Sequence, residues 1–440
     1  MTEPSGIHIT DRTLPDVAAF CNLLALSRGP TAHPNLREIS VILAKDISDR
    51  HNSQFILLSK ILAGVIARGT RLETLRLSPA EAILSQDLPD QTLRNQIHAL
   101  SNLKVLALRD AASEAGALLT GLRCRLTDLA LGNTEETAGQ DIAPYLTNLC
   151  NSLVTLQLFR TNLWHISNIF RRLKRLILED THVQDIKPLI TAFPELLEFK
   201  FLAVRGGVIA SRDQLEDVRT QNRAQQVQPS ASSGDQYTVV GYTWPSLEHV
   251  QGDIDGLYML GIRCPIRHLY IHPLVSVNQN KFRALMDDGI PEYVSLDILL
   301  RDYYVHRLVD LFPAHVFLPA RLRLRFWFRD YTRSVPEVLN CILRLLERLP
   351  TADIVIQFKE IQAHMKYFTS MDVESFADRV WASCRAVQFL CVNLGQVPFY
   401  WGNTASKADY KRIPQRISNA LGEQVLHGKG LDRAGVDYNV

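Results

Sequence analysis

Apolar residues recur along this chain in a pattern that predicts short strands, each followed by a helix. Five copies of Leu-x-x-Leu-x-Leu begin at Leu72, Leu103, Leu126, Leu153 and Leu173. The last two leucines of each copy are two positions apart, so they point to the same side of an extended strand, and the first leucine brings the chain into that strand. The residues between the leucines are then expected on the opposite, open face of a sheet.

The same spacing continues outside the five leucine copies with other apolar residues. Further copies lie at 36–41, 196–201, 247–250, 266–271 and 293–298, and strand-like runs at 6–10, 322–328, 354–358 and 387–392. From Leu36 to Leu173, successive copies start 36, 31, 23, 27 and 20 residues apart. This irregular spacing indicates connecting helices of varying length.

Apolar residues at helical spacing predict where those helices lie. We expect them over about 17–24, 53–67, 90–101, 113–122, 137–150 and 164–171, and again around Val338–Leu349. The predicted fold is therefore an α/β solenoid of about a dozen irregular units, with a curved parallel sheet inside and helices outside.

Composition divides the chain into four segments. Repeats are predicted over 1–204 and, in the same solenoid, over 244–395, separated by an insertion at 205–243 and followed by a capping helix and tail at 396–440. Within the insertion, residues 219–236 (RTQNRAQQVQPSASSGDQ) contain few apolar residues to offset the entropy of ordering them. We therefore expect 205–243 to lack fixed structure, with a domain linker as the alternative. The closing helix is expected within Ile413–Leu426.

The open face of the second half concentrates basic and aromatic side chains. In residues 321–329 (RLRLRFWFR), the four apolar residues at even positions face the core, so the arginines and the tryptophan face out. The candidate partner-binding residues are Arg321, Arg323, Arg325, Trp327, Arg329, His268, Tyr270 and His272. Guanidinium groups beside an indole ring can bind an acidic or phosphorylated peptide. Two alternatives remain: pairing of the arginines with nearby carboxylates such as Asp297 and Asp353, or binding of single-stranded nucleic acid.

Composition and charge narrow the possible functions. The 440 residues include 48 basic and 46 acidic side chains, a formal charge of +2, which argues against nucleic acid as the principal ligand. No apolar run approaches the roughly 20 residues that span a bilayer, and the first residues, MTEPSGIHITDR, lack the pattern of a signal peptide. Seven scattered cysteines without a Cys-x-x-Cys pair indicate free thiols in a reducing compartment, the cytoplasm or nucleus.

The sequence lacks the common signatures of catalysis. It contains no Gly-x-Gly-x-x-Gly or Gly-x-Ser-x-Gly, and Gly422–Lys429 misses the phosphate-loop spacing. His268 and His272 flank Tyr270 on a predicted strand, where half-exposed histidines are a better interpretation than zinc ligands. We therefore expect a non-enzymatic protein without metal or cofactor; an enzyme with a site on the loops is the alternative.

The irregular leucine copies resemble the leucine-rich-repeat superfamily, in particular the repeat region of fungal F-box/leucine-rich-repeat proteins. The resemblance covers about 390 residues and implies a scaffold that recognises a protein partner, as the substrate receptor of a ubiquitin ligase does in that family. Leu14, Pro15 and Asp16 are the only F-box-like residues, and the copy at Leu36 leaves no room for an F-box. Binding of the Skp adaptor is therefore expected only if an F-box lies upstream. The asparagine that usually follows the strand in that family is also missing, so the turns must satisfy their backbone groups in another way.

Overall fold

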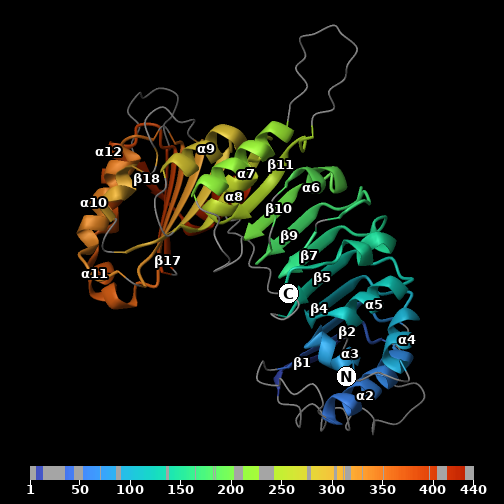
Figure 1. Cartoon of the computed structure of the whole chain (residues 1–440). Coiled ribbons are helices and arrows are strands. Elements are labelled where there is room, and N and C mark those ends of the chain that lie inside the picture. The colour runs from blue at the N-terminus through green and yellow to red at the C-terminus, as the bar shows by residue number, and fades with distance from the viewer. Residues whose placement is uncertain are drawn as a thin grey trace, which may run out of the picture. The chain divides into compact units, whose positions relative to one another are not determined.

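Strands and helices alternate along the chain in the computed structural model (Figure 1). The structure describes residues 6–12, 35–43, 53–69, 71–85, 91–134, 138–163, 165–181, 183, 185–202, 212–226, 242–274, 279–301, 305–310, 312, 319–329, 331–349, 351–395, 397–403 and 414–431. The chain divides into unit 1 (Met1–Leu196, Ala203–Ile209 and Val440) and unit 2 (Leu197–Leu202 and Ala210–Asn439). In both units parallel strands alternate with helices, which confirms the predicted α/β class.

Unit 1 contains a parallel sheet with its strands in chain order, β1-β2-β3-β4-β5-β7-β9. The strands are β1 (Gly6–Arg12), β2 (Glu38–Leu43), β3 (Thr74–Ser78), β4 (Val105–Ala111), β5 (Asp128–Asn133), β7 (Thr155–Phe159) and β9 (Arg175–Glu179), with a separate pair β6 (Gln140–Asp141) and β8 (Thr161–Asn162). The helices are α2 (Ser53–Arg68), α3 (Ala80–Ser85), α4 (Thr92–His98), α5 (Ser113–Gly121), the 3-10 helix η1 (Ala143–Leu149) and α6 (Lys187–Ala192).

The leucines of the five copies form the core of unit 1. All fifteen are at most 4% exposed, and Leu156 and Leu158 of β7 are fully buried. On the other face of the same strands, Arg76 and Gln157 are half-buried and Arg109 is exposed. This arrangement confirms the predicted assignment of the two faces.

Backbone hydrogen bonds join consecutive strands where each strand begins. The carbonyl of Glu73 accepts hydrogen bonds from the amides of both Lys104 and Val105, at 2.8 and 2.9 Å. Carbonyls in the same role belong to Arg37, Lys104, Thr127 and Val154 in unit 1, and to Leu197, Ala320 and Ala352 in unit 2. Main-chain atoms form each joint, and the hydroxyl of Thr127 also donates to the carbonyl of Lys104 at 3.1 Å, so backbone groups are satisfied here without an asparagine side chain.

Two of the helices predicted in unit 1 are wrong. In the segment expected as a helix over 137–150, the described residues 138–150 contain the short strand β6 and the 3-10 helix η1, and the described residues 165–171 contain no helix. Among the copies of unit 1, those at Leu153 and Leu173 are the closest in sequence, which leaves few residues for a helix between their strands. The predicted helices α2, α4 and α5 are present, and the one predicted over 17–24 lies outside the described residues.

Unit 2 contains the strand order β10-β11-β12-β13-β14-β15-β16-β17-β18. The strands are β10 (Glu198–Leu202), β11 (Leu247–Gly252), β12 (Ile266–Leu274), β13 (Tyr293–Leu299), β14 (Arg321–Trp327), β15 (Asp353–Lys359), β16 (Phe389–Leu394), β17 (Val397–Asn403) and β18 (Pro414–Ile417). The helices are α7 (Arg212–Gln225), α8 (Ile254–Leu260), α9 (Gln279–Gly289), η2 (Val305–Asp310), α10 (Val335–Leu346), η3 (Gln362–His364), α11 (Met365–Ser370), α12 (Val373–Ser383) and α13 (Asn419–Gly428).

The sheet of unit 2 is parallel from β10 to β16 and then changes direction. β17 and β18 are antiparallel to their neighbours, so the chain folds back after Leu394. The closing helix predicted within Ile413–Leu426 is only partly correct. Residues up to Ile417 extend the sheet as β18, and Ser418 then caps α13, its hydroxyl accepting a hydrogen bond from the amide of Leu421 at 3.4 Å.

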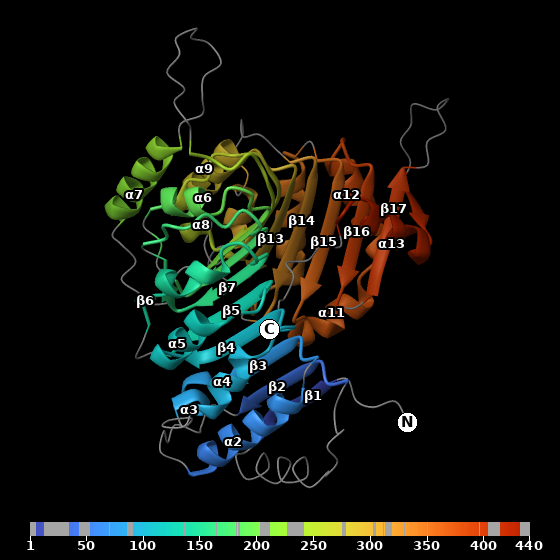
Figure 2. The same ribbon diagram turned by 90° about the vertical axis from the view of Figure 1, so that its right-hand side faces the viewer.

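The two faces of this sheet are covered by different helices. On one face, Phe376 of α12 packs on Phe358 of β15, and α10 and α12 lie together on one side of the strands in Figure 1. On the other face, Val425 of α13 packs against a cluster that includes Cys391 of β16. Figure 2 shows α13 beside β16 and β17. The face expected to be open is therefore partly covered at its C-terminal end.

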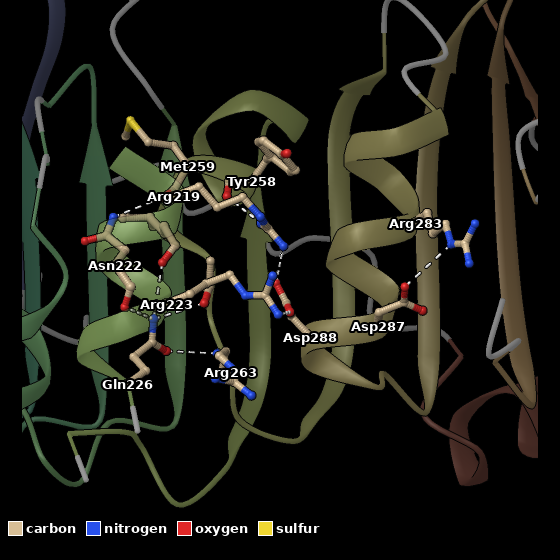
Figure 3. A network of polar contacts seen from close by, with 12 residues as sticks. Arg219, Asn222, Arg223, Gln226, Tyr258, Met259, Arg263, Arg283, Asp287 and Asp288 are labelled. Atoms are coloured by element: carbon tan, nitrogen blue, oxygen red, sulfur yellow. Dashed lines mark hydrogen bonds and ion pairs between the residues drawn. The ribbon is translucent and has the colours of Figure 1, made fainter. Parts of the chain in front are cut away.

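The predicted insertion at 205–243 contains the helix α7, which docks on α8 (Figure 3). Arg219, Asn222 and Gln226 donate side-chain hydrogen bonds to the carbonyls of Tyr258, Met259 and Gly261, at 2.7, 3.0 and 2.9 Å. All three side chains are buried, and they donate to carbonyls at the C-terminal end of α8, where helix carbonyls lack full intrahelical pairing. The expectation that this segment lacks fixed structure is wrong for 212–226; residues 203–211 and 227–241 lie outside the described part of the chain.

Candidate functional site

Seven of the eight candidate residues lie on β12 and β14, within one face of four adjacent strands of unit 2, β12 to β15. Alternation along β14 places Arg321, Arg323, Arg325 and Trp327 on this face and buries the leucines and Phe326 on the other. The parallel register places Arg323 between Ser295 and Val355. It places Arg325 between Asp297 and Gln357. The period-two pattern of the sequence thus brings together side chains from strands far apart along the chain.

Asp297 is the centre of a hydrogen-bond network on this face. Its Oδ2 accepts from Tyr270 Oη, His272 Nδ1 and Arg325 Nη1, each at 2.9 Å, and from Trp327 Nε1 at 3.3 Å. Burial by itself raises the pKa of Asp297, but the hydrogen bond from His272 and the charge of Arg325 outweigh burial and hold this pKa below its usual value. Asp297 is therefore an ionised carboxylate that fixes four of the predicted residues in place.

His268 belongs to a second chain of contacts beside this network. Its Nε2 lies 2.9 Å from Ser295 Oγ, and its Nδ1 lies 3.1 Å from His249 Nδ1. Its ring stacks on Tyr293, with 4.2 Å between the ring centroids. Among the residues that the structure describes, no group of three or more His, Cys, Asp and Glu side chains is placed to hold a metal ion.

The three arginines of β14 differ in how their charges are neutralised. Arg325 forms an ion pair with Asp297, whose side chain is 2% exposed. Arg321 lies 3.7 Å from a carboxylate oxygen of Asp353 and donates to the carbonyl of Lys429 at 3.1 Å. Arg323 is 6% exposed, and its Nε and Nη1 have no hydrogen-bond partner among the described residues. The carboxylate-pairing interpretation therefore fits Arg321 and Arg325 but not Arg323.

The prediction that the whole set forms an exposed surface is wrong for several of its members. His268 and Tyr270 are each 5% exposed and Arg323 is 6% exposed, whereas Arg329 is exposed beyond the end of β14. Neighbouring strands are only about 4.8 Å apart, so long polar side chains on adjacent strands cover one another. Burial, followed by the nearby charge of Asp297, raises the pKa of Tyr270 well above its usual range.

Two residues of β15 that the sequence analysis missed complete the face. Gln357 Oε1 accepts a hydrogen bond from Arg325 Nε at 3.1 Å. Burial, and then repulsion by the charges of Arg325 and Arg323, lowers the pKa of Lys359. Continuing the alternation along β15 from Asp353 would have placed both residues here.

The surroundings of this site determine how it is interpreted. None of the described helices is long and apolar enough to cross a membrane. The face is a largely buried polar network in which two nitrogens of Arg323 lack a hydrogen-bond partner among the described residues. No model of a known protein family matches the chain, and no curated protein matches it either.

Proposed function

We propose that the chain is a non-enzymatic scaffold of the leucine-rich-repeat kind, a solenoid of about a dozen units that recognises a segment of a protein partner on the open face of β12–β15. The buried leucine copies and the backbone joint repeated at the start of the strands support this architecture. Scaffolds built from stacked repeats use the extended face of their strands to bind other macromolecules. The partner segment is acidic or phosphorylated.

Arg323 is the observation that carries this proposal. Buried N–H groups of a guanidinium without acceptors are unfavourable, because they have lost water and gained no hydrogen bond in exchange; in Arg323 this applies to Nε and Nη1. A carboxylate or phosphate accepts two parallel hydrogen bonds from one guanidinium group. An anionic group of a partner would therefore supply what Nε and Nη1 of Arg323 lack.

The charges around Arg323 also favour an anionic ligand. The basic side chains of this face are Arg321, Arg323, Arg325, Lys359 and Lys429, and the carboxylates that pair with them are Asp297 and Asp353. The lowered pKa of Lys359 follows from burial and from this excess of positive charge. A segment that brings negative charge reduces the repulsion between these groups.

Binding of short peptides to the purified chain tests the proposal. Fluorescent peptides with glutamate or phosphoserine are compared by anisotropy with matched peptides that carry glutamine or serine. We expect the acidic versions to bind at least about tenfold more tightly, equivalent to roughly 1.4 kcal/mol. Arg323→Met should remove this difference, whereas Arg329→Met, which changes an exposed arginine of the same segment, should keep it. Equal affinity of the wild type for acidic and neutral peptides would overturn the proposal.

The resemblance to F-box/leucine-rich-repeat proteins extends the proposal to a biological role. In that role the chain is the substrate receptor of a ubiquitin ligase in the cytoplasm or nucleus, and it binds the Skp adaptor only if an F-box lies upstream. Purification of the tagged natural protein tests this role separately. Recovery of a Skp adaptor and a cullin supports it, and a stable set of partners that lacks both removes it while leaving the peptide-binding proposal intact.

A further inference from the structure

The chain's own C-terminal residues cover part of the face to which we assign partner binding. Leu431 is fully buried in an apolar cluster formed by Tyr293, Val355, Phe389, Cys391 and Tyr400, and Ile417, Val425 and Leu426 pack against the same cluster. Tyr293 and Val355 belong to β13 and β15, on either side of β14. The covered cluster is therefore continuous with the basic strand.

Residues 429–431 contact this face as a bound peptide would. The carbonyl of Lys429 accepts a hydrogen bond from Arg321 at 3.1 Å, and the carbonyl of Leu431 accepts one from Tyr293 Oη at 3.3 Å. The ammonium group of Lys429 pairs with Asp353. Two main-chain carbonyls are thus held by donors of the site, and one leucine side chain fills the apolar cluster.

Residues 429–431 lie directly beside Arg323 but leave its Nε and Nη1 without an acceptor among the described residues. Arg323 is in register with Val355, which is in register with Cys391, so the three side chains form one row across the face. The contacts of 429–431 with this face bring an acceptor to Arg321 and to Tyr293, while two nitrogens of Arg323 have none among the described residues. Residues 429–431 therefore fit the apolar part of the face but leave the positive charge of Arg323 uncompensated.

The cover is attached by few buried side chains. In α13 only Gly422 is buried, and Leu421 is 47% exposed. By contrast, α10 on the other face of the sheet buries eight residues. Elements with few buried apolar contacts open locally more often than the rest of a structure.

We propose that Lys429–Leu431 is an internal ligand that reversibly occupies a peptide pocket on β13–β16, and that a partner segment with a leucine-sized side chain next to an acidic group displaces it. The choice of partner rests on the proposed function; the reversible cover does not. The acidic group of the partner pairs with Arg323, which gives the partner a contact that the internal segment lacks.

Two cysteines of unit 2 form a matched pair that tests the cover. Cys391 lies under Leu431, and Cys264 lies outside the covered cluster; they are 2% and 3% exposed, and burial raises the pKa of each to about 12. Alkylation of both thiols by an uncharged maleimide is followed peptide by peptide by mass spectrometry. We expect Cys391 to react at least about tenfold faster than Cys264 in the native chain, because local opening exposes only Cys391.

Substitutions at two buried leucines make this test specific. Leu431→Ala should accelerate labelling of Cys391 by a further tenfold or so and leave Cys264 unchanged, because it weakens only the cover. Leu345→Ala, at a fully buried residue of α10, is the matched control and should accelerate both thiols together. Equal labelling of the two cysteines in the wild type, and equal acceleration of both by Leu431→Ala, would show that the cover opens only on global unfolding and would overturn the inference.

Peptide affinities separate this inference from the proposed function. Peptides that contain Leu-x-Glu or Leu-x-phosphoserine should bind Leu431→Ala at least about tenfold more tightly than the wild type, because no internal segment competes. If the peptides bind both chains equally, the internal-ligand inference is wrong and the proposed function stands. If Cys391 opens selectively but neither chain binds an acidic peptide, the proposed function is wrong and the reversible cover stands.

Discussion

Asp297 and Arg323 are buried charged residues on the same sheet face that differ in their hydrogen bonding. Asp297 receives hydrogen bonds from four side chains, including the guanidinium group of Arg325. Arg323 occupies the same face of β14 as Arg325, yet two of its nitrogens have no partner among the described residues. The hydrogen bonds to Asp297 stabilise the folded unit. The two unpaired nitrogens of Arg323 reduce its stability and remain available to a ligand.

Substitution of the two arginines by methionine should therefore have opposite effects on stability. Arg325→Met leaves Asp297 without its cation and should lower the free energy of unfolding by about 3–5 kcal/mol. Arg323→Met removes an unsatisfied charge and should leave the free energy of unfolding unchanged or raise it by about 1–3 kcal/mol. Urea unfolding followed by circular dichroism measures both. A large loss of stability in Arg323→Met would mean that its guanidinium group supports the fold.

The lowered pKa of Asp297 predicts a specific dependence of stability on pH. Its folded pKa lies below the ordinary value of 3.8, so the ionised carboxylate stabilises the protein fully above that value. This contribution is lost as the pH falls through the folded pKa. Between about pH 5 and pH 2, the free energy of unfolding should thus decrease less steeply in Asp297→Asn than in the wild type. Asp287→Asn, at an exposed site of the same unit, serves as the control, and identical slopes in wild type and Asp297→Asn would contradict the prediction.

At the scale of elements, sequence patterns predicted the strands whose apolar residues are buried. They missed the features that depend on polar contacts between residues far apart in the chain. Leu156 was placed correctly because a leucine on either side of a strand makes very different contributions to the hydrophobic core. The helix α7 was missed because Arg219 and its acceptor, the carbonyl of Tyr258, are 39 residues apart. The contact of the C-terminal residues with this face was missed for a similar reason, since Leu431, whose carbonyl accepts from Tyr293, lies 138 residues after it. No local pattern contains such pairings.

The docking of α7 can be tested through one buried amide. Asn222 is fully buried, and its Nδ2 donates to the carbonyl of Met259 at 3.0 Å. Asn222→Ala leaves that carbonyl unsatisfied and should destabilise the docked helix by about 1–3 kcal/mol. Trypsin should then cleave after Arg219 and Arg223 faster than in the wild type. Gln221→Ala, at an exposed neighbouring position, should leave the cleavage rate unchanged, and rapid cleavage of the wild type at Arg219 would mean that α7 is not stably docked.

At the scale of the whole molecule, both units are built from parallel strands with a buried apolar face. They differ in the side chains on the other, open face of those strands. The open face of unit 1 includes the small or apolar residues Ala107, Ala130 and Ile177. The equivalent face of unit 2 holds the polar network around Asp297. The formal charge of the chain is only +2, so attraction of an acidic partner depends on this local cluster rather than on a general positive charge.

A local cluster of this kind predicts a limited dependence of binding on salt. The affinity for an acidic peptide should fall as sodium chloride rises from about 0.05 to 0.5 M, because the exposed part of the interaction is screened. The contact with Arg323 is buried and should persist, so the affinity should reach a plateau above that of the neutral control peptide. Peptide titrations at several salt concentrations measure this. A continuous decrease to the level of the neutral peptide would place the binding charges at the exposed surface.

The joint between consecutive strands has a consequence for how a chain of this kind can change its length. At each joint a carbonyl receives two amide hydrogen bonds from the next strand, whether its residue is arginine, glutamate, lysine, threonine or valine. A segment that contains one strand and its connection could therefore be duplicated in tandem or deleted, and the new neighbours would meet through the same main-chain geometry. After duplication, the side chains of the open face are free to diverge, while the leucines remain constrained by the core.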